Sequence, residues 1–121
     1  MKVPTVGQVA RSDVPRASLE EPLAEVRARL SESGWETAMV VNEAEVVLGR
    51  LYKSQIDEDP DVPVQEAMEE GPSTFRPNVS IFKMRDTMRE EDLDTAPVTT
   101  SEGVLVGMVL REDVSKSTSV S

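Results

Sequence analysis

Apolar residues in the first half of this chain follow the period of a helix and then the period of strands. Spacings of three and four within 22–34 predict one amphipathic helix that ends near a glycine. Two short runs rich in β-branched residues, 37–41 and 46–52, flank a polar turn and predict a hairpin. A short helix is expected from about Ser54. The helical stripe consists of Leu23, Val26 and Leu30.

The second half repeats this order of signals. A short extended piece at 73–75 precedes Ser80, which is a good N-cap for a helix. The runs 95–99 and 104–110 predict a second hairpin, and another short helix is expected near Arg111. The second helical stripe consists of Ile81, Met84 and Met88.

A fixed offset of 58 residues relates the two halves without a gap, so that Val46 falls on Val104 and Gly49 on Gly107. A constant offset over so much of the chain indicates two copies of one structural unit. Each unit is read as β-α-β-β-α, and the fold class is therefore α+β (α/β), with two pseudo-symmetric repeats packed as one module. A pair of this kind usually packs about a pseudo-two-fold axis, which creates two related clefts.

The repeats also set the expected domain boundaries. Residues 1–58 form repeat 1 with a lead-in helix at 6–11, and residues 59–114 form repeat 2 with a similar lead-in at 64–69. The serine-rich segment 115–121 has the composition of a disordered tail.

Composition narrows the classes of function. The formal net charge of -10 argues against binding to nucleic acid or to an anionic membrane surface, since both require a basic face. The chain has no cysteine, so it has no thiolate nucleophile, and it has no histidine, the commonest general base and transition-metal ligand. No apolar stretch approaches the length of a membrane span, and the N-terminus has no signal-peptide pattern. We expect a cytoplasmic protein that is not an enzyme and holds no metal.

The ordered motifs resemble a tandem pair of cystathionine beta-synthase (CBS) domains, also called a Bateman module, here free-standing. Repeat 2 carries the better match: 64–68 and 71–72 are similar to the lead-in of the family, 96–98 to its proline-containing strand, and 103–109 to its hairpin strand. Repeat 1 shares the valine-rich strands but has Met39 in place of the proline.

The resemblance implies regulatory modules that form dimers and bind adenosine-containing ligands such as AMP, ADP, ATP or S-adenosylmethionine. Ligand-binding members end the last strand on Thr or Ser and place an Asp three residues later. A carboxylate suits this task because it accepts short, charge-assisted bonds from both hydroxyls of a ribose. Here repeat 2 keeps Asp113 but has Leu110 at the hydroxyl position. A helix dipole alone also explains an acidic residue in a first turn.

The corresponding positions of repeat 1 have lost this chemistry. They hold Tyr52 and Gln55, an aromatic ring and an uncharged amide, so that this second site is expected to be degenerate. Gln55 accepts one hydrogen bond without charge, and Tyr52 fills space where a ligand would lie.

The resemblance implies further candidates in repeat 2. The positions that correspond to Thr74, Thr95, Ala96 and Pro97 read or sandwich the adenine ring in the family, although ordinary strand packing also accounts for these residues. Among the arginines, Arg111 is a candidate for phosphate binding near the rim.

Two functions therefore remain open. The first is a non-catalytic regulatory module that senses an adenosine ligand through the repeat 2 cleft and requires no cofactor. The second is an interaction or dimerisation scaffold whose clefts no longer bind. Both allow a homodimer and a protein partner that the sequence does not identify.

Overall fold

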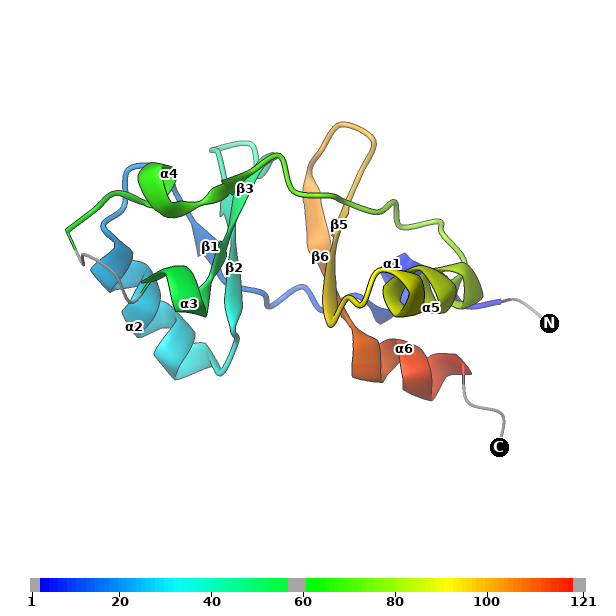
Figure 1. Cartoon of the computed structure of the whole chain (residues 1–121). Coiled ribbons are helices and arrows are strands. Elements are labelled where there is room, and N and C mark those ends of the chain that lie inside the picture. Colours follow the sequence, from blue (N-terminus) through cyan, green and yellow to red (C-terminus); the bar gives the residue numbers. More distant parts are fainter. Residues whose placement is uncertain (1–2, 57–60, 119–121) are drawn as a thin grey trace. The chain divides into compact units, whose positions relative to one another are not determined.

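The computed structural model describes residues 3–56 and 61–118 (Figure 1). Its mixed helices and strands confirm the α+β fold class and both predicted hairpins. The chain divides into two compact units, Val14–Pro72 and Met1–Asp13 with Ser73–Ser121. We call them the first-repeat unit and the second-repeat unit, after the hairpin that each contains.

The first-repeat unit is a four-stranded sheet with helices packed against it. The strand order is β1-β2-β3-β4, in which β1 runs parallel to β2 and the other neighbours are antiparallel. Its elements are β1 (Arg16–Ala17), α2 (Leu23–Ser33), β2 (Thr37–Val41), β3 (Val47–Tyr52), α3 (Lys53–Ile56), α4 (Val64–Ala67) and β4 (Glu69–Glu70). The core is aliphatic and draws on all three helices and on the sheet. Its buried residues are Ala17, Leu23, Val26, Leu30, Ala38, Val40, Leu51, Ile56 and Val64.

The second-repeat unit is built around the two-stranded sheet β5-β6. Single bridges extend this sheet on both sides, Phe75 beside Val98 and Arg11 beside Met108. Its elements are α1 (Val6–Val9), α5 (Ile81–Glu90), β5 (Thr95–Thr99), β6 (Leu105–Leu110) and α6 (Arg111–Thr118). The core consists of Val6, Ile81, Met84, Met88, Ala96, Val98, Val109 and Val114. Both predicted helical stripes are therefore buried.

The two hairpins share one register. Thr37 pairs with Tyr52 just as Thr95 pairs with Leu110, and each hairpin has an irregularity near the end of its first strand. Because of this irregularity, the second strand of each hairpin begins one residue later than the sequence predicts. The preceding extended segments also agree, since the parallel pairing of β1 with β2 recurs between Phe75 and Val98. Residues that are 58 positions apart in the sequence therefore occupy the same place in the strand pairing of the two hairpins.

Local chemistry sets the helix ends as expected. The α2 helix ends at Gly34, which adopts the left-handed conformation (φ 79°) and donates its N–H to the Leu30 carbonyl at 3.0 Å. The α5 helix begins after Ser80, whose hydroxyl accepts the N–H of Lys83 at 3.1 Å. These caps fix where each helix delivers the chain to its hairpin.

The lead-in segments differ from the predicted domain boundaries, because each packs with the other repeat. The α1 lead-in, assigned to repeat 1 from the sequence, belongs to the second-repeat unit, and the α4 lead-in belongs to the first-repeat unit. Each lead-in is also shorter than expected, because its last residues pair with a strand. Arg11 exchanges two backbone hydrogen bonds with Met108, both 2.9 Å, and Glu69 pairs with Arg50.

A glycine in each hairpin makes this pairing possible. A Cβ on Gly107 would lie 2.6 Å from the Arg11 carbonyl oxygen, and one on Gly49 would lie 2.9 Å from the carbonyl oxygen of Glu69. Both distances are below van der Waals contact. The exchanged lead-ins therefore approach their strands only because these two positions lack a side chain.

The predicted tail is another difference. Residues 115–118 continue α6, whose Val114 is buried and whose Thr118 hydroxyl donates to the Val114 carbonyl at 3.0 Å. The anchoring of Val114 in the core keeps this serine-rich stretch helical against its composition. Residues 119–121 lie outside the described residues.

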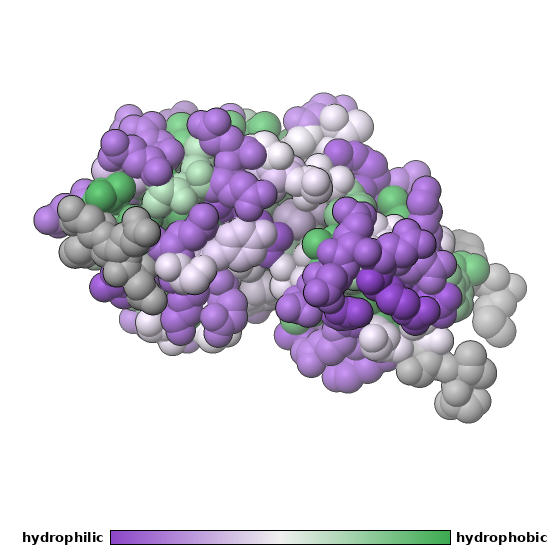
Figure 2. Space-filling model, in the orientation of Figure 1, coloured by the Kyte–Doolittle hydropathy of each residue, from purple (hydrophilic) through white to green (hydrophobic). Residues whose placement is uncertain are grey.

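The surface seen in Figure 2 is predominantly hydrophilic, in keeping with an acidic chain of mean hydropathy -0.33. Within residues 3–56 and 61–118, no helix has both the length and the apolar character needed to cross a bilayer.

The close approach at the two glycines predicts unequal effects of adding a methyl group. Gly107→Ala meets backbone atoms of Arg11 and should lower the free energy of unfolding by about 1–3 kcal/mol. Gly49→Ala should cost less, because its Cβ would lie further from the nearest backbone atom, 2.9 Å from the Glu69 carbonyl oxygen, and its other close contact is with the flexible Met68 side chain. Urea unfolding of both variants, with Glu102→Ala as a surface control, measures the difference. Equal losses at the two glycines would contradict the assignment.

Candidate ligand-binding site

Asp113 lies in the first turn of α6 and is held by Arg11 from the exchanged lead-in. The Arg11 Nε donates to Oδ2 at 2.7 Å and Nη2 donates to Oδ1 at 2.9 Å, which is a two-pronged guanidinium–carboxylate pair. The Asp113 side chain is only 16% exposed, whereas that of Arg11 is 45% exposed. The candidate carboxylate therefore has a fixed orientation.

This contact also fixes the charge of Asp113. Hydrogen bonding to the Arg11 guanidinium lowers the pKa of Asp113, and partial burial opposes this effect less strongly. The same hydrogen bond raises the pKa of Arg11. Asp113 is therefore an ionised acceptor at neutral pH, which is the state that diol binding requires.

Three of the sequence-predicted residues meet at one end of the β5–β6 hairpin. Thr95 opens β5 and pairs directly with Leu110, the last residue of β6, so that their side chains lie on the same face. Asp113 follows Leu110 by three residues in the first turn of α6. The hydroxyl that is missing at Leu110 is thus present on its cross-strand neighbour.

Ala96 and Pro97 lie on the same strand but in different surroundings. Ala96 is fully buried in the apolar core, where the alternation of a strand places it with Val98. Pro97 faces the other side with Thr95, and its carbonyl accepts the N–H of Phe75 at 2.9 Å. Ala96 contributes backbone and core packing at this position.

Thr74 precedes Phe75, which pairs with Val98 in the middle of β5. Its hydroxyl accepts a hydrogen bond of 3.0 Å from Nη2 of Arg76. The other terminal nitrogen of Arg76 donates to the hydroxyl and carbonyl of Thr99 and to the carbonyl of Thr100, at the far end of β5. Thr74 therefore belongs to a bridge between the extended segment and the hairpin turn.

Arg111 lies beside Leu110 and engages two aspartates. Its Nη1 is 3.2 Å from the Asp92 carboxylate and 3.9 Å from that of Asp94, and its backbone N–H donates to the Asp94 carbonyl. Leu110 and Arg111 line a shallow depression of about 480 Å³ together with Asp94, Glu112 and Ser115. A phosphate here would compete with exposed ion pairs, which contribute little to stability.

The first-repeat counterparts are occupied by contacts of their own. The Gln55 side-chain oxygen accepts the backbone N–H of Tyr52 at 2.9 Å, so the amide caps its own helix. Met39 is fully buried and pairs with Arg50 across the strands. The Arg50 guanidinium lies 4.5 Å from the centre of the Tyr52 ring.

Arg50 is a residue that the sequence analysis missed. It is only 5% exposed, its Nε donates to the Thr37 hydroxyl at 3.0 Å, and burial lowers its pKa. A charged residue inside the apolar run 47–52 was the available signal. The corresponding residue of repeat 2 is Met108, so this buried charge has no counterpart there.

The part of the chain that the structure describes contains no group of three acidic side chains that could hold a metal ion. Around Asp113, one oriented carboxylate paired with Arg11 is available for hydrogen bonding, and Thr95 lies on the neighbouring strand end.

Comparison with known proteins places this geometry in a family. Residues 61–119 match the CBS domain model. An uncharacterized protein of Methanopyrus kandleri is 24% identical over 94% of this chain, which spans 62% of the length of that relative.

Solved structures agree with the fold over nearly the whole chain. The cytosolic domain of the Mg2+ channel MgtE in complex with ATP has a TM-score of 0.86 at 23% identity, covering 93% of this chain and 48% of that one. A CBS domain pair in complex with 5′-methylthioadenosine and S-adenosyl-L-methionine has a TM-score of 0.80 at 17% identity, covering 95% of both chains. Residues 61–119 are therefore a CBS domain, and the chain as a whole has the fold of a CBS domain pair.

Proposed function

We propose that this chain is a non-catalytic regulatory module that binds an adenosine-containing ligand in its second repeat. Asp113 accepts the ribose hydroxyls, and Thr95 and the backbone at Pro97 lie beside the adenine. The candidate ligands are AMP, ADP, ATP and S-adenosylmethionine, and no cofactor is required. The complexes of similar folds with ATP and with S-adenosyl-L-methionine support this class of ligand.

The observation that carries the proposal is the charged and oriented state of Asp113. An acidic residue that merely complements a helix dipole needs no partner outside its helix. Asp113 instead receives both prongs of Arg11 from a segment 102 residues away in sequence. Each carboxylate oxygen accepts more than one hydrogen bond, so Arg11 leaves acceptor capacity for a diol while it holds the geometry.

A second function is favoured by the state of the first repeat. The Gln55 side-chain oxygen already accepts the backbone N–H of Tyr52, and the Arg50 guanidinium lies over the Tyr52 ring. If the second repeat were equally closed to ligands, the chain would serve as an interaction or dimerisation scaffold. One titration separates the two functions.

A thermal-shift titration with the four candidate ligands tests the sensor function. A ligand that binds only the folded protein stabilises it by about 2.7 kcal/mol at a hundredfold excess over Kd, so the melting temperature should rise and saturate with one of them. Asp113→Ala should abolish this rise. Glu102→Ala removes the same charge from an exposed turn and should retain it.

The outcomes are distinct. No shift with any candidate up to millimolar concentration would assign the scaffold function. A shift that survives Asp113→Ala would leave the ligand class standing but would place its site elsewhere.

The charge of Asp113 predicts a dependence of stability on pH. Because the folded-state pKa of Asp113 is lowered, its ionised form stabilises the fold above the unfolded pKa of about 4, and this contribution is lost as the pH falls through the folded value. The free energy of unfolding of the wild type should therefore exceed that of Asp113→Asn by a constant amount above about pH 5, and the excess should shrink below about pH 4. Urea unfolding across this range measures it. An excess that grows in acid would contradict the assigned charge.

We also propose that the chain forms a homodimer through α5. Phe82 is 40% exposed on this helix, and the Arg85 guanidinium lies 5.4 Å from the centre of its ring. Sedimentation velocity should show a dimer whose dissociation constant rises at least tenfold in Phe82→Ser, since a half-exposed aromatic anchor contributes about 1.5 kcal/mol or more at an interface. Lys83→Ser, one position further on, should leave it unchanged. A wild type that remains monomeric at a concentration on the order of 100 µM would overturn the proposal.

A further inference from the structure

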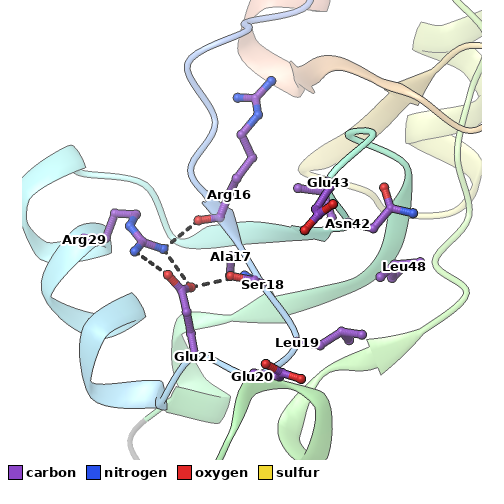
Figure 3. A pocket seen from close by; sticks show the side chains of 11 residues that line it. Arg16, Ala17, Ser18, Leu19, Glu20, Glu21, Arg29, Asn42, Glu43 and Leu48 are labelled. Carbon is purple, nitrogen blue, oxygen red and sulfur yellow. Dashed lines mark hydrogen bonds and ion pairs between the residues drawn. The ribbon is translucent and has the colours of Figure 1, made fainter.

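The first-repeat unit contains a hollow of about 780 Å³ that the ligand-binding hypothesis does not use (Figure 3). It lies between the segment that follows β1 and the turn that joins β2 to β3. Leu19 and Leu48 contribute apolar surface, and Ser18, Asn42 and Glu43 line it with polar groups. Tyr52 and Gln55 belong to the opposite end of the same hairpin.

The equivalent space in the second-repeat unit is occupied by Arg76. The matching registers of the two hairpins place Arg76 at the position of Ser18, and Thr99 and Thr100 at the positions of Val41 and Asn42. Arg76 donates to the Thr99 carbonyl at 2.8 Å and to the Thr100 carbonyl at 2.6 Å. A guanidinium thus bridges the extended segment and the hairpin turn in one repeat.

Ser18 is too short to form this bridge in the other repeat. Its backbone N–H donates to the Glu21 carboxylate at 3.2 Å, within the same turn. The Asn42 carbonyl accepts the Glu45 N–H, as the Thr100 carbonyl accepts the Gly103 N–H. Because the Thr100 oxygen accepts Arg76 in addition, the same geometry leaves acceptor capacity at Asn42.

The arginines that border the hollow are engaged in ways that do not fill it. Arg29 forms a two-pronged pair with Glu21, at 2.8 and 3.1 Å, and donates to the Arg16 carbonyl at 2.6 Å. The Arg16 side chain extends away from Leu19 (Figure 3). Its Nη1 donates to the Val14 carbonyl at 2.9 Å.

The rim of the hollow carries negative charge. The carboxylates of Glu20 and Glu43 are exposed and form no ion pair with any described residue. A cationic guest would therefore meet two available carboxylates, apolar walls and backbone carbonyl oxygens.

We propose that this hollow binds the guanidinium of an arginine side chain presented by a basic segment of a partner protein. The guest takes the place that Arg76 occupies in the second repeat, donating to the carbonyl oxygens at the β2–β3 turn while its methylenes contact Leu19 and Leu48. Arginine is selected over lysine because its planar fork reaches several acceptors at once. The chain's net charge of -10 attracts such a segment from a distance. The assignment is independent of adenosine binding.

A pair of short peptides tests the proposal on the full chain. Backbone amide NMR signals are followed while acetyl-Gly-Arg-Gly-amide or acetyl-Gly-Lys-Gly-amide is added. The arginine peptide should shift the signals of 18–21 and 41–43 with a dissociation constant on the order of 1 mM. The lysine peptide should bind at least about fivefold more weakly, because its ammonium group makes only one point contact.

Two variants locate the effect. Ser18→Arg should fill the hollow from within, as Arg76 does, and abolish the shifts. Glu43→Gln should weaken binding about threefold without changing the fold, and Glu102→Gln, a matched exposed glutamate in the other hairpin, should not. The pattern of dispersed amide signals shows that each variant is folded.

Four results would overturn the proposal. Equal affinity for the two peptides would indicate unspecific attraction to an acidic surface. Shifts that persist in folded Ser18→Arg, or none up to about 20 mM arginine peptide, would exclude a guanidinium in the hollow. If diluting the protein alone moved the same signals, the occupant would be a second copy of this chain.

Discussion

The contact on which each unit depends is the close approach of a lead-in backbone to the outer strand of a hairpin. It occurs at Gly107, beside Arg11, and at Gly49, beside Glu69. Each hairpin presents an edge whose N–H and C=O groups need partners, and the incoming segment supplies them. The lead-in comes from the sequence of the other repeat, so each unit combines segments of both repeats. A side chain at either glycine would strain this pairing.

The same contact determines what chemistry each site can have. In the second-repeat unit the paired lead-in residue is Arg11, and its side chain reaches the Asp113 carboxylate. In the first-repeat unit the equivalent residues are Glu69 and Gln55, which offer no such ion pair, and Gln55 turns to its own backbone. A residue on the exchanged segment thus decides whether the helix that follows the hairpin carries an oriented charge. This difference is the physical reason why adenosine binding is proposed for the second repeat alone.

The sequence predicts the repeats and their elements because strand alternation, helical spacing and caps are local properties. Ser80, Gly34 and the stripe of α5 lie where short-range rules place them. The exchange of lead-ins is not local, since 6–11 and 64–69 look alike and nothing within them states which hairpin each will pair with. The composition of the serine-rich stretch 115–118 predicts a disordered tail, because the burial of Val114 in the core is a tertiary contact that local sequence does not reveal. Among the site residues, Asp113, Leu110 and Thr95 could be brought together from register alone, whereas the positions of Thr74 and Arg50 depend on side-chain partners that periodicity does not reveal.

The two repeats share the same strand register, and they differ in the side chains that occupy equivalent positions. Arg76 closes the gap between extended segment and turn in one repeat, and Ser18 leaves it open in the other. In the first repeat the Arg50 guanidinium lies over the Tyr52 ring at the other end of the hairpin, whereas the second repeat has the uncharged Met108 and Leu110 at these two positions. The second repeat is therefore filled at the turn end of its hairpin, and the first repeat is filled at the opposite end. The two proposed binding sites can therefore differ without a change of fold, because the glycine contacts set the backbone register and other residues line each site.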